Sequence, residues 1–327
     1  MGWVIAALLL FVSPATAQQI TIDRVEAMPA LPSDYLVPDW KARARAFDAL
    51  AFDTTRRGDG LPLAFTFAAP NGFEGFGLTT FAGERRGQTK EAISALPALV
   101  SASLVGQPRA DWVGKAQAYF ASQPAERVYL NSPGGRSGDD WWYDTMPNVF
   151  FYQLYDRYGA STGDFRSQFV AVANRWLTAL DSLGGDVRPW ARPFLGYRGF
   201  ALSTMEPNRS GVIEPEAAGA LAWIMWMAYD ETGDDRYRVG AEWALQFLEE
   251  WDRNPSYELQ LPYGALAAAR ANAELGARYD VEQLVRWSFE VGDLRKWGTF
   301  TDGDWNGYSA AGLVGSVNDF GGYAVAL

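Results

Sequence analysis

The sequence predicts an all-α fold in which buried helices alternate with amphipathic helices, so that two concentric layers form. The alternation is clearest in residues 214–263. Residues 217–229 are apolar on every side, which is typical of a helix that is buried all round. After a short turn, residues 235–251 place apolar side chains on one face and charged side chains between them. That pattern indicates a helix at the surface of the fold.

The same alternation recurs along the chain at intervals of roughly fifty residues, as in a structural repeat. Because the loops between the units are long and unequal, we expect a closed ring of helical hairpins rather than a regular solenoid. The buried helices are expected to begin near residues 89, 141, 215, 258 and 308, and the partners of the first four to cover residues 110–122, 164–183, 235–251 and 281–291.

The remaining segments are expected to form one more helix and three long loops. Residues 40–52 place apolar side chains on one face of a helix. Residues 56–84 are rich in Gly and Phe and read as a long functional loop that could contain a short hairpin. Residues 184–213 and 292–307 are expected to be loops as well.

The composition excludes several kinds of chemistry. The chain of 327 residues contains no Cys and no His. Disulfides, thiol nucleophiles, Ser-His-Asp triads and the usual zinc sites are therefore excluded. Any catalysis must use carboxylates, Tyr, Lys, Arg or a bound ion. The formal net charge of −11 argues against nucleic acid or an anionic membrane as the main partner.

The N-terminus has the pattern of a secretory signal peptide over residues 1–17. An apolar run over residues 3–12 is followed by Ala15-Thr16-Ala17, which matches a small-x-small cleavage site. The alternative is a short buried helix, since no positive charge precedes the apolar run. Residues 18–39 are Pro-rich and irregular. We expect a secreted or periplasmic protein, because no later apolar run is long enough for a membrane span.

Residues 40–327 resemble the (α/α)6-toroid carbohydrate-active enzymes, a superfamily with many secreted bacterial glycoside hydrolases and polysaccharide lyases. The resemblance implies one catalytic domain, a ring of six hairpins with its substrate cleft where the inner helices begin. Only five inner helices are predicted, so we expect a ring that is incomplete at the C-terminus or closed by an N-terminal segment. The resemblance rests on the alternation and on the runs Trp141-Trp142-Tyr143-Asp144 and Glu214-Pro215-Glu216-Ala217-Ala218.

Three acids are the candidate catalytic residues, because each begins a predicted inner helix: Asp144, Glu216 and Glu258. Asp144 follows three aromatic residues, where desolvation should raise the pKa of its carboxyl group. The structural alternative for each acid is a helix cap or a partner of the helix dipole. Asp140 is the better candidate for the cap of its helix.

Aromatic residues in the same loops are candidate platforms for sugar rings, although large aromatic side chains more often fill the core. An arginine there could bind a carboxylate or sulfate group in a bidentate manner. The candidate substrate-binding residues are Trp141, Trp142, Tyr143, Arg209, Tyr257, Tyr263 and Trp305.

Asp302, Asp304 and Asn306 match the first half of a calcium-binding loop. The twelfth position of that loop is Leu313 rather than the Glu that binds calcium through both oxygens. We therefore expect no cofactor, with calcium as the weaker alternative.

The leading hypothesis is a secreted glycoside hydrolase that cleaves a polysaccharide or oligosaccharide by inversion, with two carboxyl groups as acid and base. The first alternative is a polysaccharide lyase with Tyr143 or Tyr263 as base and Arg209 to neutralise a uronate. The second is a glycan-binding protein without catalytic activity. Each hypothesis expects a monomer with a carbohydrate ligand, no nucleic acid and no membrane span.

Overall fold

The computed structural model describes residues 20, 39–58, 60–79, 87–159, 162–257, 259–296, 298–300, 304–305, 308–309, 314–318 and 321–323. From residue 298 onward only the backbone is described. The chain is mainly helical and carries little sheet, which confirms the mostly α fold class. The predicted signal peptide lies outside the described residues. Within the described part of the chain, no helix has the length and apolar character needed to cross a membrane.

The helices begin close to the predicted positions, and of the four expected to be buried, those over Trp141–Tyr158 and Ala217–Thr232 are buried most extensively. The four buried helices expected near residues 89, 141, 215 and 258 begin at residues 92, 141, 217 and 260. The helices are α2 (Trp40–Ala51), α3 (Ala92–Leu104), α4 (Ala110–Val113), α5 (Trp141–Tyr158), α6 (Phe165–Ser182), α7 (Ala217–Thr232), α8 (Asp235–Glu249), α9 (Gln260–Leu275) and α10 (Val281–Phe289).

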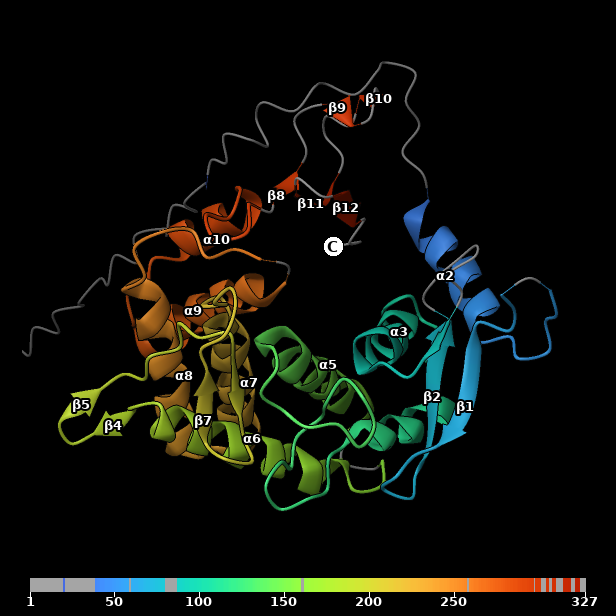
Figure 1. Ribbon diagram of the computed structural model, residues 1–327, viewed down its shortest axis with the longest axis horizontal. Coiled ribbons are helices and arrows are strands. Elements are labelled where there is room, and N and C mark those ends of the chain that lie inside the picture. The colour runs from blue at the N-terminus through green and yellow to red at the C-terminus, as the bar shows by residue number, and fades with distance from the viewer. Residues whose placement is uncertain are drawn as a thin grey trace, which may run out of the picture.

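Helices α3, α5, α7 and α9 pack in chain order, each against the next. Helix α6 contacts α5 and α7, α8 contacts α6, α7 and α9, and α10 packs on α9. Figure 1 shows this series following a curve from α2 and α3 on one side to α9 and α10 on the other. The four helices expected to form the inner layer therefore make one continuous packed series, and α6, α8 and α10 pack against members of that series.

The burial of α7 and α8 matches the two patterns in the sequence. Helix α7 is buried along nearly its whole length, whereas α8 buries only one face. Close packing of α7 on α9 depends on two glycines. A Cβ atom on Gly219 would lie 2.5 Å from the carbonyl oxygen of Gln260, and one on Gly264 would lie 2.7 Å from the Cα of Gly219. Larger residues would therefore force these helices apart.

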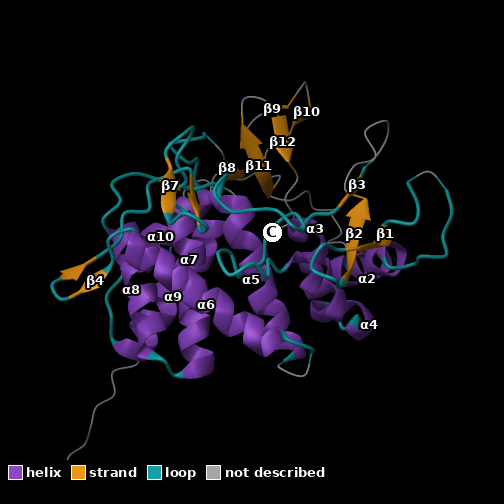
Figure 2. Cartoon of the chain, turned by 60° about the horizontal axis from the view of Figure 1, so that its bottom comes forward, coloured by secondary structure: helices purple, strands orange, loops and turns teal. Residues whose placement is uncertain are grey.

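The strands form small antiparallel sheets of two or three strands. Figure 2 shows β7, β8 and β11 above the helical layer. The hairpin allowed for in residues 56–84 is present. The strands are β1 (Ala64–Ala68), β2 (Glu74–Thr79), β3 (Gln88–Thr89), β4 (Asp186–Val187), β5 (Trp190–Ala191), β6 (Gly199–Ala201), β7 (Glu206–Asn208), β8 (Gly298–Phe300), β9 (Asp304–Trp305), β10 (Tyr308–Ser309), β11 (Val314–Asn318) and β12 (Gly321–Tyr323).

Two predictions of helix were wrong. The fifth buried helix, expected from Tyr308, is replaced by strands β10, β11 and β12. Glycines at positions 312, 315, 321 and 322 disfavour a helix there, and the two valines of β11 favour a strand. The helix expected over residues 110–122 is short. It is α4, continued by a 3-10 helix over Gly114–Tyr119.

Candidate functional site

Helices α5 and α7 begin side by side, and one backbone amide links them. Asp140 caps α5, and its Oδ1 accepts a hydrogen bond from the Trp142 amide at 2.8 Å. Oε2 of Glu214, just before α7, lies 3.1 Å from the same amide. The first amides of a helix have no partner within the helix and carry partial positive charge, so carboxylates are favoured there. The capping role predicted for Asp140 is confirmed.

Helix α9 begins at the same end of the molecule. The Thr145 hydroxyl lies 2.8 Å from the Trp141 carbonyl oxygen and 2.9 Å from Oε1 of Gln260. Gln260 is the first residue of α9 and is fully buried. The structure therefore brings together the starts of α5, α7 and α9. We call Asp140, Asp144, Glu214 and Glu216, with Arg198 and Arg295, the helix-start site.

Two arginines contact two acids of this site, Glu214 and Asp140. Arg198, which precedes β6, donates a hydrogen bond from one guanidinium nitrogen to Glu214 and another from the second nitrogen to Asp140. Arg295, which follows α10, donates to Glu214 Oε1 at 2.5 Å. Glu214 is fully buried, and Asp140 is nearly so. A buried carboxylate is tolerated only when charges and hydrogen bonds compensate it, and this cluster supplies both.

The pKa of Glu214 is raised above its usual value. Burial raises the pKa of Glu214 to about 8, and the nearby negative charge of Asp140 adds to the effect. Arg198, Arg295 and the Trp142 amide act in the opposite direction. Desolvation exceeds these attractions, so the pKa of Glu214 stays above its usual value although two arginines contact the group.

Asp144 lies in the first turn of α5 and is a second acid of the site with a raised pKa. It is buried, and its Oδ2 accepts a hydrogen bond from the Gly138 amide at 2.7 Å. Burial raises its pKa well above the usual value, and the charges of Asp140, Glu126 and Asp139 raise it further against the lowering effect of the Gly138 amide. The raised pKa that the sequence predicts for Asp144 is therefore present.

Of the other two catalytic candidates, the structure describes one. Glu216 immediately precedes α7 and is buried. Its carbonyl oxygen accepts the Gly219 amide at 2.8 Å, within the first turn. Glu258 lies outside the described residues. Asp144 and Glu216 are thus both buried acids near the starts of two neighbouring helices, but Asp144 lies inside the first turn of α5, whereas Glu216 precedes α7.

The aromatic candidates divide into core residues and residues of the rim. Trp141 is fully buried between Trp176 and Phe200, which is the core alternative left open by the sequence. Trp142 is half-buried, and Tyr143 is 44 % exposed. The last two could therefore meet a ligand at the start of α5.

The remaining substrate-binding candidates are spread more widely. Tyr257 is half-buried, with the Arg295 guanidinium 3.9 Å from its ring centre, so it borders the helix-start site. Arg209 is exposed and lies 4.7 Å from the ring centre of Tyr197. Tyr263, within α9, accepts a hydrogen bond from Gln153 at 2.9 Å, and burial raises its pKa. A raised pKa disfavours Tyr263 as a catalytic base.

The proposed calcium loop cannot be placed. Asp302 and Asn306 lie outside the described residues, and only the backbone is described for Asp304 and Trp305, which form β9. Elsewhere in the described part, no group of three or more acidic side chains could hold a metal ion. Calcium binding and the role of Trp305 in the site stay predictions.

Sequence reasoning missed the importance of Glu214, Arg198 and Arg295. Glu214 was visible as an acid before Pro215, at the start of a buried helix. Its partner Arg198 lies 16 residues before it in the chain, and its partner Arg295 lies 81 residues after it. No local pattern marks pairs so far apart, and only the three-dimensional fold brings them together.

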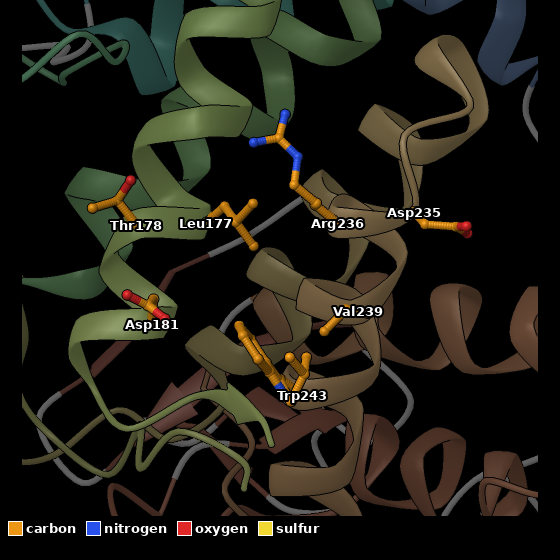
Figure 3. Close-up of a pocket in the computed structure, with 8 residues that line it drawn as sticks. Leu177, Thr178, Asp181, Asp235, Arg236, Val239 and Trp243 are labelled. Carbon is orange, nitrogen blue, oxygen red and sulfur yellow. The ribbon is translucent and has the colours of Figure 1, made fainter. Parts of the chain in front are cut away.

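A separate pocket lies between outer helices α6 and α8, where Figure 3 shows the side chains of both helices bordering one space. Its volume is about 390 Å³. Arg236 is held by Asp234 at 2.6 Å and Asp235 by Arg238 at 3.0 Å, so these charges are already compensated. The pocket contains no predicted site residue; its lining is Leu177, Thr178, Asp181, Val187, Asp235, Arg236, Val239 and Trp243.

Comparisons with protein-family models, with curated proteins and with solved structures found no match to this chain. The function must therefore be inferred from the residues of the helix-start site.

Proposed function

We propose that the chain is a secreted glycoside hydrolase that binds a polysaccharide or oligosaccharide at the helix-start site. The observation that carries the proposal is Asp144, a buried carboxyl group with a strongly raised pKa at the start of an inner helix. Glycoside hydrolysis needs one carboxyl group that is protonated at neutral pH and a second one that is ionised. Environments that separate the pKa values of neighbouring acids are characteristic of such sites.

Asp144 is the proposed proton donor to the leaving oxygen. Burial raises the pKa of Asp144 and so favours the protonated form, and the Gly138 amide fixes the orientation of its carboxyl group. Glu216 is the proposed base that activates water, because it is a buried acid at the start of α7, which packs against α5. An inverting enzyme requires roughly 6.5–9.5 Å between the two carboxyl groups, so that a water molecule fits between them.

Asp140 and Glu214 have a supporting role in this proposal. Oxygens of both acids are engaged by Arg198 and by the Trp142 amide. Arg295 engages Glu214 as well. These contacts fix the starts of α5 and α7 relative to each other, and thereby fix Asp144 relative to Glu216. Precise placement of this kind is worth several orders of magnitude in rate.

The packing order of the helices supports carbohydrate chemistry. Helices α3, α5, α7 and α9 pack in chain order, α6 and α8 contact α7, and α10 packs on α9. We propose that these hairpins belong to an (α/α)6 toroid. The resemblance of the sequence to toroid enzymes implies that substrate binds where the inner helices begin, and the acids of the helix-start site lie there.

Purified protein incubated with a panel of polysaccharides tests the proposal. New reducing ends without ultraviolet-absorbing unsaturated products indicate a hydrolase. Unsaturated products would indicate the lyase instead, which would then depend on the exposed Tyr143 and on Arg209. Binding without either product would leave a glycan-binding protein. Asp144→Asn and Glu216→Gln should each lose hydrolysis, whereas Glu231→Gln, at the far end of α7, is the matched control.

A further inference from the structure

Glu126 is a buried acid that the proposed chemistry does not use. It lies in the segment between the 3-10 helix and α5 and is 3 % exposed. Its Oε2 accepts a hydrogen bond from the Ser137 hydroxyl at 2.7 Å and lies 3.4 Å from the Ser137 amide. The next amide in the chain, that of Gly138, donates to Asp144. Glu126 and Asp144 thus hold two consecutive residues of one loop.

The same loop is fixed on its other side by β6 and the residue after it. The Ser137 hydroxyl oxygen accepts the Leu202 amide at 2.8 Å. Gly138 has a φ of +117°, and a Cβ there would lie 2.8 Å from the Cβ of Ala201 in β6. Only glycine fits such a conformation at so close an approach. The Gly138 amide is therefore held in one orientation, toward Asp144.

We propose that Glu126 is a positioning residue of the helix-start site: it anchors Ser137 and, through it, the Gly138 amide that contacts Asp144, and it places a second carboxyl group behind Asp144. The proposal deepens the hydrolase hypothesis and rests on the role of Asp144 as proton donor.

The surrounding charges support this role. The acids that act on Asp144 are Asp140, Glu126 and Asp139, and each raises its pKa. Asp139 is exposed to solvent, which weakens its effect through screening, whereas Glu126 is buried. Asp140 is paired with Arg198. Glu126 is therefore the buried acid whose charge is least compensated by an ion pair among these three.

A positive group that acts on Glu126, Arg175, makes its hydrogen bonds elsewhere. Arg175 interacts electrostatically with Glu126, but its Nη2 donates to the carbonyl oxygens of Ala125 and Leu202. Oε1 of Glu126 is buried and has no hydrogen-bond partner among the described residues. A buried charge with incomplete compensation acts strongly on neighbouring groups because little water screens it.

Glu126→Gln tests the effect of the Glu126 charge apart from the effect of its hydrogen bond with Ser137. The amide keeps the size of the side chain and an oxygen that can accept from Ser137, but it removes the negative charge. We expect the midpoint of the Asp144 titration to fall by on the order of one pH unit. The basic limb of the kcat/KM profile should move to lower pH by the same amount, because the proton donor ionises earlier. A purely structural contact would not move this limb.

The titration is measured by carboxyl-carbon NMR on protein labelled at aspartate, with the Asp144 signal assigned by its absence in Asp144→Asn. Glu231→Gln, which removes a carboxylate at the far end of α7, should leave the midpoint unchanged. An unchanged midpoint in Glu126→Gln would overturn the proposal. If the midpoint moves but no polysaccharide is cleaved, the coupling to Glu126 stands and the hydrolase hypothesis fails.

Ser137→Ala provides a second test, which can be used even if Glu126→Gln does not fold. This variant keeps the Glu126 side chain and removes the hydroxyl group that donates a hydrogen bond to it. We expect the Gly138 amide proton to move upfield, because its hydrogen bond to Asp144 loosens when Ser137 is no longer anchored. A Gly138 signal at its wild-type position in Ser137→Ala would contradict the anchoring role.

Discussion

The two ends of α7 carry similar chemical groups in opposite surroundings. Before its start, Glu214 is fully buried and meets Arg198 and Arg295. At its last turn, Glu231 is 41 % exposed and meets Arg166, which is 44 % exposed, beside the hydroxyl of Tyr155. The ends are about 24 Å apart, since sixteen residues rise about 1.5 Å each.

The difference shows how strongly burial acts on an acid that meets arginines. Burial raises the pKa of Glu214 to about 8 although it meets two arginines. At the exposed end, the hydrogen bond to the Tyr155 hydroxyl and the charge of Glu231 raise the pKa of Arg166. At the buried end, burial raises the pKa of both Glu214 and Asp144. Four changes would break or sharpen this contrast.

The largest effect is expected from Asp144→Asn. Loss of the proton donor should lower kcat on the panel polysaccharide by roughly a hundredfold to ten-thousandfold. Stability should change little near neutral pH, because the amide resembles a protonated carboxyl group and can still accept the Gly138 amide. Steady-state kinetics and urea unfolding measure the two quantities. Glu231→Gln should retain wild-type kcat; an equal loss in both variants would remove the distinction between the ends.

The next effect concerns stability. Arg198→Met would leave Asp140 and Glu214 buried without their shared partner, and breaking such a cluster costs about 3–5 kcal/mol. Arg166→Met breaks an exposed pair and should cost about 0–1 kcal/mol. Urea denaturation of both variants at pH 7 gives the comparison. Similar losses in the two proteins would mean that burial does not distinguish the clusters.

Much of this contrast could be foreseen from local sequence, and part of it could not. The apolar run of α7 and the one-sided pattern of α8 correctly predict how each helix is buried, because the spacing of apolar residues follows the buried face. Asp140 is correctly predicted as the cap of α5. The pairing of Glu214 with Arg295 joins chain segments far apart in the sequence, so no local spacing indicates it. The strands after Tyr308 are not predicted, although the glycines of that segment disfavour a helix.

A smaller effect is expected in the pH dependence of stability. The ordinary pKa of glutamate is 4.5, and that of folded Glu214 is about 8. Between these values the folded protein binds a proton that the unfolded chain has lost. Stability from this group is therefore fully present below pH 4.5 and falls as pH rises toward 8, by up to about 1.4 kcal/mol per pH unit.

Glu214→Gln should flatten that slope, because an amide does not titrate. Urea midpoints between pH 5 and pH 8.5 measure the slope in both proteins. Glu231→Gln, at the exposed end, should keep the wild-type slope. The prediction fails if the slopes of wild type and Glu214→Gln coincide.

The smallest effect is the coupling energy of the exposed pair itself. A double-mutant cycle of Arg166 and Glu231 should give about 0.2–1 kcal/mol at low salt, since solvent competes for both groups. In 1 M salt the Debye length falls to about 3 Å, so this coupling should nearly vanish. The cycle of Arg198 and Glu214 should keep most of its value, because ions cannot enter the buried cluster. Equal salt dependence of the two cycles would show that solvent and ions reach the start of α7, and the raised pKa of Asp144 would then lack its physical cause.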